Sequence, residues 1–164
     1  MHHCYMGGLL EHSLAVVQIC DFLSTRYKHV NRDILIASAM LHDVGKTREL
    51  SAFPMNDYTD DGQLLGHIII GIQLMAEEIA KIEDFPDRLA SMLKHCVISH
   101  HGILEYGSPK VPQTIEAFIL HCADDSDAKI KAFEDFIGTN EANNGSWMGY
   151  HKMLQRNIRK TDVK

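Results

Sequence analysis

The chain has little of what several protein classes require: long apolar runs, paired cysteines and an excess of positive charge. A membrane-spanning helix needs about 18 or more consecutive apolar residues, and no run approaches that length. The four cysteines form no Cys-x-x-Cys pair, which argues against a disulfide framework and a structural zinc site. The 16 Lys and Arg residues against 22 Asp and Glu residues give a net charge of −6, so bulk positive charge does not hold this chain on nucleic acid.

The first residues also lack a targeting signal. Met1 to Tyr5 do not form the basic start and apolar stretch of a secretory signal peptide. Dispersed cysteines suit a reducing compartment. We therefore expect a cytoplasmic protein that has no membrane partner.

What the chain does have is an ordinary globular composition and many histidines. Its 164 residues, of which 45% are hydrophobic and 23% charged, fit one compact domain. Eleven histidines in an acidic chain are unusual. Because imidazole binds metals and transfers protons near neutral pH, these histidines indicate a chemical site.

Apolar residues recur at helical spacing over most of the chain, and no useful alternating strand pattern is present. Asp33 can cap the second helix and Gly45 suits its end, while residues 47–66 and 102–112 are rich in loop signals. We predict an all-α fold with helices over residues 9–26, 33–45, 67–82, 88–99 and 114–136. The predicted domain covers residues 1–137, and residues 138–164 are predicted to be a linker and a basic tail that packs on or frays from it.

The strongest local motif is Leu41-His42-Asp43-Val44-Gly45-Lys46 at the end of an apolar helix. Burying an imidazole, a carboxylate and an ammonium group together costs several kcal/mol unless a partner compensates, and a divalent cation is the simplest partner. A helix end with a solvated carboxylate is the alternative interpretation.

Further candidate ligands lie near helix ends or beside glycines. A bundle of short helices can gather such positions around one cavity, and a carboxylate that bridges two ions accounts for seven ligands. In chain order the candidates are His12, His42, Asp43, His67, His100, His101 and Asp124. Asp125 and Asp127 compete with Asp124 because they lie within one helical turn of it.

This pattern resembles the HD superfamily of metal-dependent phosphohydrolases in its two-ion form. Residues 2–136 are most similar to the catalytic domain of the YhaM-type 3'-5' exoribonucleases. The stretches that carry this similarity are Gly7-Gly8-Leu9-Leu10-Glu11-His12, residues 41–50, Gly66-His67, Ser99-His100-His101-Gly102 and Leu120-His121-Cys122-Ala123-Asp124-Asp125.

The resemblance implies an α-helical HD fold and a specific ligand set. His12, His42, Asp43 and Asp124 would bind one ion, and Asp43, His67, His100 and His101 the other, so Asp43 would be the bridge. Mn²⁺ or Fe²⁺ suit these ligands best, and Ni²⁺, Zn²⁺ or Mg²⁺ can occupy such a site after purification.

Several other residues are assigned supporting roles. Lys46, one helical turn beyond His42, is the expected phosphate contact and joins Asp43 in the catalytic group. Arg48 and His3 are predicted to contact substrate, and His121 is predicted to orient Asp124.

The resemblance implies a phosphodiesterase that removes nucleotides from the 3' end of RNA or short oligonucleotides. The exoribonucleases carry a preceding OB-type domain, whereas this sequence starts close to the first motif, so the expectation is either a catalytic fragment or a stand-alone hydrolase. A separate nucleic-acid-binding domain or a homo-oligomer is an expected partner. Alternatives are a phosphohydrolase acting on mononucleotides or signalling nucleotides, and an HD binding module without turnover. A cyclic-dinucleotide phosphodiesterase ranks lower, because Glu105-Tyr106-Gly107-Ser108-Pro109 replaces the Gly-Tyr-Pro element of those enzymes.

Overall fold

The computed structural model describes residues 7–52, 54–140 and 145–163, and it is mostly helical. The all-α prediction is confirmed, with one small two-stranded sheet added. The elements are α1 (Gly8–Ser24), α2 (Arg32–Leu41), α3 (Lys46–Glu49), α4 (Asp60–Ile79), α5 (Asp87–Ser99), the 3₁₀ turn η1 (Leu104–Tyr106), α6 (Ile115–Thr139), β1 (Trp147–His151) and β2 (Arg156–Arg159). Among the described residues, none of the helices is both long and apolar enough to cross a bilayer.

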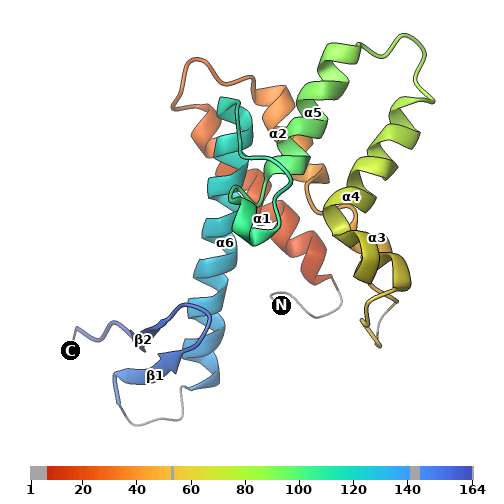
Figure 1. Ribbon diagram of the computed structural model, residues 1–164. Helices are drawn as coiled ribbons and strands as arrows, with labels where there is room; N and C mark the ends of the chain where they lie inside the picture. The colour runs from red at the N-terminus through yellow and green to blue at the C-terminus, as the bar shows by residue number, and fades with distance from the viewer. Residues whose placement is uncertain (1–6, 53, 141–144, 164) are drawn as a thin grey trace.

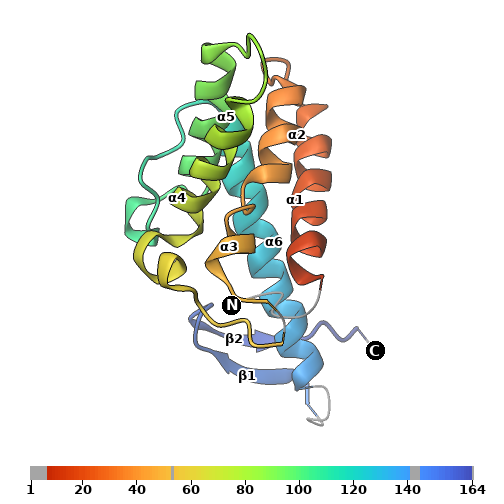
Figure 2. The same cartoon turned by 90° about the vertical axis from the view of Figure 1, so that its right-hand side faces the viewer.

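Helix α6 is the element that most of the bundle shares. It packs against α1, α2 and α5, while α4 packs against α5 and carries the short α3 on its other side (Figures 1 and 2). Small and β-branched residues let these helices approach closely. The main core cluster contains Val16, Cys20, Leu35, Ala39, Cys96, Ala117, Ile119, Leu120 and Ala123.

Side-chain caps begin three of the helices. Thr114 caps α6 by accepting a hydrogen bond from the backbone N–H of Ala117, which agrees with the sequence-based start of that helix. The cap of α2 is Asn31 and not Asp33, since the Asn31 side chain accepts from the N–H of Ile34. Asp33 instead lies in the first turn, where its charge favours the helix dipole.

The predicted loop over residues 47–66 was wrong at both ends. The chain forms α3 immediately after Gly45, and α4 begins at Asp60, with Thr59 as its cap. Two aspartates in the first turn of α4 favour a helix start there. Gly66, at φ 72° and ψ 161°, then kinks α4 directly before His67, a conformation that glycine adopts easily.

The tail forms a β-hairpin, which the sequence pattern did not predict. Strands β1 and β2 pair antiparallel, and the hairpin projects beyond the helical body at the C-terminal end of α6 (Figure 1). Met148, Leu154 and Ile158 are buried against Ala132 and the neighbouring aromatic residues of α6. This contact anchors the hairpin, whereas the division of the chain at residue 137 stays a prediction.

Candidate metal centre

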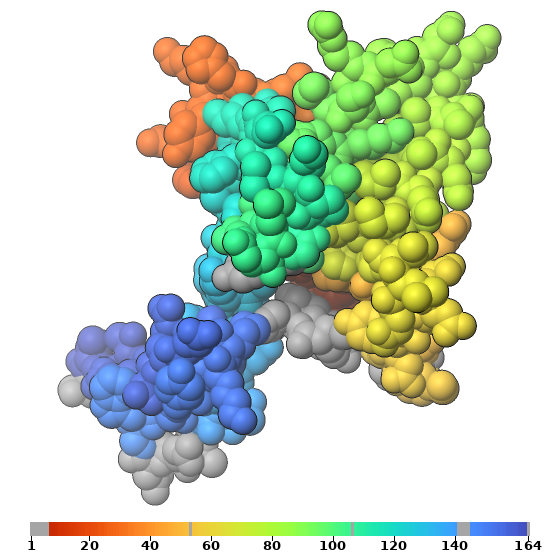
Figure 3. Space-filling model, viewed as in Figure 1, coloured from red at the N-terminus to blue at the C-terminus, as the bar shows by residue number. Residues whose placement is uncertain are grey.

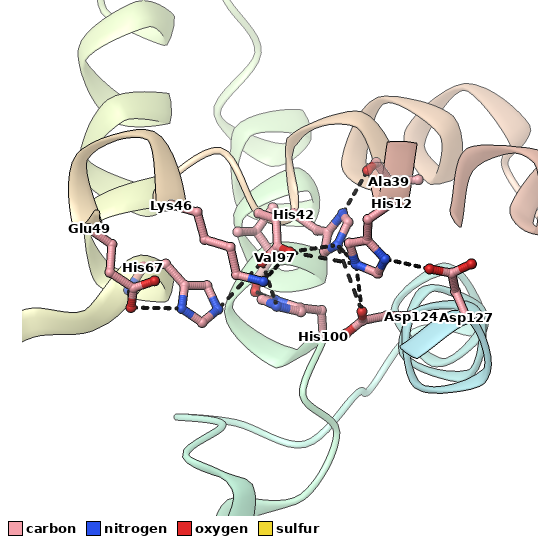
Figure 4. Close-up of polar contacts among 11 residues, drawn as sticks. His12, Ala39, His42, Lys46, Glu49, His67, Val97, His100, Asp124 and Asp127 are labelled. Carbon is pink, nitrogen blue, oxygen red and sulfur yellow. Dashed lines mark hydrogen bonds and ion pairs between the residues drawn. The ribbon is translucent and has the colours of Figure 1, made fainter. Parts of the chain in front are cut away.

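The seven predicted ligands converge from five helices on one place in the middle of the bundle. His12 lies on α1, His42 and Asp43 follow α2, His67 follows the kink in α4, and Asp124 lies on α6. His100 and His101 follow the last turn of α5. Figure 4 shows the imidazoles of His12, His42, His67 and His100 in a row between α4 and α6.

His12, His42 and Asp124 form a first triad, in which one ligand atom of each residue lies within 4.8 Å of the others. The Nε2 atom of His12 is 3.1 Å from Oδ1 of Asp124 and 3.3 Å from Nε2 of His42. Nδ1 of His12 faces Asp127 and Nδ1 of His42 faces the carbonyl oxygen of Ala39, so with the protons on Nδ1 both Nε2 atoms present lone pairs to each other. The arrangement therefore favours a positive charge at this point, either an added proton or a metal ion.

His67, His100 and His101 form a second triad with the same spacing. Nε2 of His67 and Nε2 of His100 are buried and have no hydrogen-bond partner among the described residues. They lie 3.5 and 3.8 Å from Oδ1 of Asp43, which is also buried without a partner. Buried polar atoms without partners are costly, so three of them facing one point fit a site for a cation.

Asp43 lies between the two triads and presents one oxygen to each. Its Oδ2 atom is 3.6 Å from Nε2 of His12 and 3.5 Å from Nε2 of His42. Its Oδ1 atom faces His67 and His100 instead. With only 2% of its surface exposed, this carboxylate is placed as a bridge would be.

Backbone carbonyls fix the two most buried imidazoles. Nδ1–H of His42 donates to the carbonyl oxygen of Ala39 at 2.8 Å, and Nδ1–H of His100 donates to that of Val97 at 2.6 Å. Both rings use the free carbonyl three residues earlier, at the end of their helices. Because the proton is held on Nδ1, the Nε2 lone pair is left for a metal.

Carboxylates fix the two outer imidazoles in the same tautomer. Nδ1 of His12 lies 2.6 Å from Oδ2 of Asp127, and Nδ1 of His67 lies 3.1 Å from Oε1 of Glu49 (Figure 4). Histidine ligands commonly donate their second N–H to such an outer carboxylate. Neither role was predicted from the sequence. The signal for Asp127 was its position three residues beyond Asp124, on the same helix face.

The carboxylates make the first triad attractive to positive charge. Burial opposes protonation of His12 and His42, but hydrogen bonds and charges from Asp124, Asp127 and Asp43 outweigh it and raise the pKa of both histidines. Burial also opposes ionisation of Asp43, yet His42 and Lys46 hold its pKa well below the usual value.

Two histidines of the second triad, His67 and His100, are held neutral by burial. Burial lowers the pKa of His100 to about 3 and also lowers the pKa of His67. The second triad therefore keeps these two imidazoles in the form that binds metal.

The supporting residues occupy different places. Nζ of Lys46 donates to Oδ2 of Asp43 at 2.6 Å, with 35% of its side chain exposed. Arg48 faces Glu77 on the outside of α4, at 3.8 Å. His121 donates from Nδ1 to the carbonyl oxygen of His100 and not to Asp124. His3 lies outside the described residues.

We expect Glu49→Ala to weaken Mn²⁺ binding by about 10–100-fold, because it removes the carboxylate that orients His67. Glu49→Gln should retain most of the affinity, since its amide oxygen can still accept from His67 N and Nδ1, at the positions where Glu49 accepts at 2.9 and 3.1 Å. Calorimetric titration of both variants measures this, with the exposed Glu77→Ala as control. A Glu49→Ala affinity within twofold of the parent would contradict the role.

Known proteins resemble this chain over most of its length. The HD-domain family matches residues 9–129. The 3'-5' exoribonuclease YhaM of Listeria welshimeri is 42% identical over 139 residues, covering 83% of this chain and 43% of the relative. That of Bacillus subtilis is 36% identical over 133 residues, covering 81% and 42%.

The chain thus spans a little over two fifths of the length of the curated relatives it matches. No solved structure matches the chain significantly. The matched family and the relatives together show that this chain belongs to the HD-domain family of metal-dependent phosphohydrolases.

Proposed function

We propose that the chain binds two divalent cations and hydrolyses phosphodiester bonds in RNA or short oligonucleotides from the 3' end. One ion would be held by His12, His42, Asp43 and Asp124, and the other by Asp43, His67, His100 and His101. Mn²⁺ or Fe²⁺ suit imidazole and carboxylate ligands together, and Ni²⁺, Zn²⁺ or Mg²⁺ are the expected substitutes.

The observation that supports this proposal most directly is the position of Asp43. Each of its oxygens faces a different triad, and the one facing the second triad has no other partner among the described residues. A single ion would leave one triad without a cation. Two ions that share Asp43 would satisfy all the inward-facing nitrogens.

When bound, such an ion pair supplies Lewis-acid activation of water and neutralises the charge that develops on phosphorus oxygens. The chain's own contribution is orientation: four imidazoles have Nδ1 held by a carbonyl or carboxylate. Lys46 supplies a cation beside Asp43, with 35% of its side chain exposed. Burial opposes its charge, but Asp43 raises the pKa of Lys46, so its ammonium group stays protonated and can bind a substrate phosphate.

The direction and the RNA substrate rest on the relatives, which are named 3'-5' exoribonucleases. A 5'-labelled RNA oligomer incubated with Mn²⁺ tests both points. Stepwise shortening of the labelled strand is the expected result. An intact oligomer beside hydrolysed mononucleotide would favour a nucleotide phosphohydrolase, and binding without turnover under several metals would favour a non-catalytic module.

We expect Mn²⁺ to stabilise the protein. At a free concentration about 100 times the Kd, binding adds about 2.7 kcal/mol, which corresponds to roughly 5–10 °C in Tm for a chain of this size. The first triad should make this gain depend on pH. Because the pKa of His12 and of His42 is raised without metal, protons compete with the ion, and affinity should fall as pH is lowered.

Thermal unfolding with Mn²⁺ and with chelator, repeated at pH 8 and pH 6, measures both effects. The loss should reach up to about tenfold in affinity per pH unit for each proton released. A Tm that is the same with chelator and with every divalent ion tested would refute the metal centre.

A further inference from the structure

The hairpin carries aromatic side chains on its outward face that the metal centre does not use. In the register of the two strands, Trp147 lies opposite Arg159 and Tyr150 opposite Asn157, and an irregularity after Trp147 shifts the alternation by one residue. These four residues therefore share one face, which we call the outward face. Trp147 is 64% exposed and Tyr150 57% exposed.

The opposite face of the hairpin fixes it to α6. Ile158 is fully buried, and the ring of His151 packs edge-on against Phe136 with centroids 4.9 Å apart. Because the inner face is anchored on α6, the two exposed rings of the outward face are held in place. Ordered aromatic rings on a solvent-facing sheet suit stacking with flat ligands.

The charge of the hairpin is opposite to that of the whole chain. Residues 145–163 carry four cations, Lys152, Arg156, Arg159 and Lys160, against the single carboxylate of Asp162, a net charge of +3 in a chain of −6. Asp162 pairs with Arg159 at 2.7 Å and accepts from the Ser146 hydroxyl. Lys152 and Lys160 have no carboxylate partner among the described residues. The acidic neighbours on α6, Glu134 and Asp135, pair with Lys131 at 3.2 and 3.6 Å.

The hairpin packs on α6, the helix that also carries Asp124. Ala132, the first α6 residue buried under the hairpin, follows Asp124 by eight residues, which is about 12 Å along a helix. The hairpin forms a separate lobe beside the body (Figure 3). A strand whose end is at the metal centre could therefore reach this lobe within a few nucleotides.

We propose that the hairpin binds single-stranded RNA, with bases stacked on Trp147 and Tyr150 of its outward face and phosphates near Lys152 and Lys160, which directly follow the ends of β1 and β2. Aromatic stacking combined with a local basic surface is how proteins hold single strands without reading their sequence. The inference rests on the proposed function in one respect, that the substrate is a polynucleotide. It gives an acidic protein a local means of holding that substrate.

Binding of a 5'-fluorescein 12-nucleotide unstructured RNA to the full chain, followed by anisotropy in EDTA, tests this without hydrolysis. The double variant Trp147→Ala/Tyr150→Ala should raise the Kd by about 10-fold or more. Trp147→Phe/Tyr150→Phe should stay within about threefold of the parent because the stacking surfaces remain. The matched control is Phe22→Ala/Phe118→Ala, which removes rings that are 65% and 58% exposed on α1 and α6 and should leave the Kd unchanged.

The phosphate interactions are tested by salt dependence. Lys152→Gln/Lys160→Gln should reduce the slope of log K against log salt by about 0.7 for each phosphate that a lysine no longer neutralises, whereas Lys28→Gln in the loop after α1 should not change it. If the aromatic variant fails to fold, this charge variant decides the question alone. A parent-like Kd in the aromatic variant, or a parent-like slope in the charge variant, overturns the proposal.

Two further measurements distinguish RNA binding by the hairpin from the hydrolase activity and from self-association of the chain. Turnover of bis-p-nitrophenyl phosphate should be unchanged in the hairpin variants. A parent that turns over neither this ester nor RNA would refute the proposed function while leaving RNA binding measurable. Sedimentation of the parent and the aromatic variant tests self-association, and a dimer that dissociates in the variant with no change in RNA affinity would overturn the proposal.

Discussion

Asp43→Asn is expected to lower Mn²⁺-dependent hydrolysis of bis-p-nitrophenyl phosphate more than 100-fold, because loss of an outer partner of a ligand alone costs about 10–100-fold. Asparagine preserves the shape of this buried residue. It replaces one of the two anionic oxygens, and the triads on either side would no longer share a charged ligand. The number of bound ions, measured by metal analysis after desalting, should fall below two.

The control for this substitution is Asp125→Asn. Asp125 immediately follows Asp124 but pairs with Lys129 on the outer side of α6, at 2.7 Å. Its substitution should leave activity and metal content within about twofold of the parent, as expected for an exposed ion pair. Full activity in Asp43→Asn, with the parent's metal content, would remove the bridge from the mechanism.

Gly45→Ala is expected to destabilise the fold by about 3 kcal/mol or more, at the upper end for overpacked sites. A Cβ atom on Gly45 would lie 1.9 Å from the backbone oxygen of His67 and 2.7 Å from the backbone nitrogen of Gly71. Both neighbours are backbone atoms of α4, so α4 would have to move away. Because His67 lies at this contact, the second triad would be displaced with it.

Thermal unfolding checks this prediction, and a loss of that size corresponds to roughly 6–12 °C in Tm for a chain of this length. Gly138→Ala is the matched control. It lies in the last turns of α6 with nothing within 4 Å of the added carbon, so alanine should be neutral or stabilise by up to about 1 kcal/mol. A Gly45→Ala protein with the parent's Tm would show that α4 shifts at little cost.

The sequence by itself determined the all-α class, most of the helices and the candidate ligands. Helical periodicity and caps such as Thr114 are local, because they depend on residues within a few positions of each other. The ligand candidates were found since histidine and aspartate at helix ends are chemically distinctive, as in His42-Asp43 and His100-His101. The HD family was also identifiable from these short motifs, and the comparisons confirm it.

Only the tertiary structure decided how those residues meet. Gly45 looked like a helix-ending glycine, but α2 ends at Leu41, and Gly45 has an ordinary helical φ of −61°. Glycine is required at position 45 because the backbone of α4 occupies the space that a side chain would fill. Such a contact joins residues 45 and 67, and no local pattern encodes the distance between them.

The carboxylates that orient His12 and His67, and the hairpin, also depend on the tertiary structure and could not be predicted from the sequence. Asp127 lies 115 residues from His12, and Glu49 lies 18 from His67, so these hydrogen bonds exist only once the helices have packed. The strands of the hairpin are short, and the irregularity after Trp147 breaks the period-two pattern by which strands are recognised. Local propensity specified the helices and their chemistry, whereas close packing of distant backbones specified which oxygen faces which nitrogen.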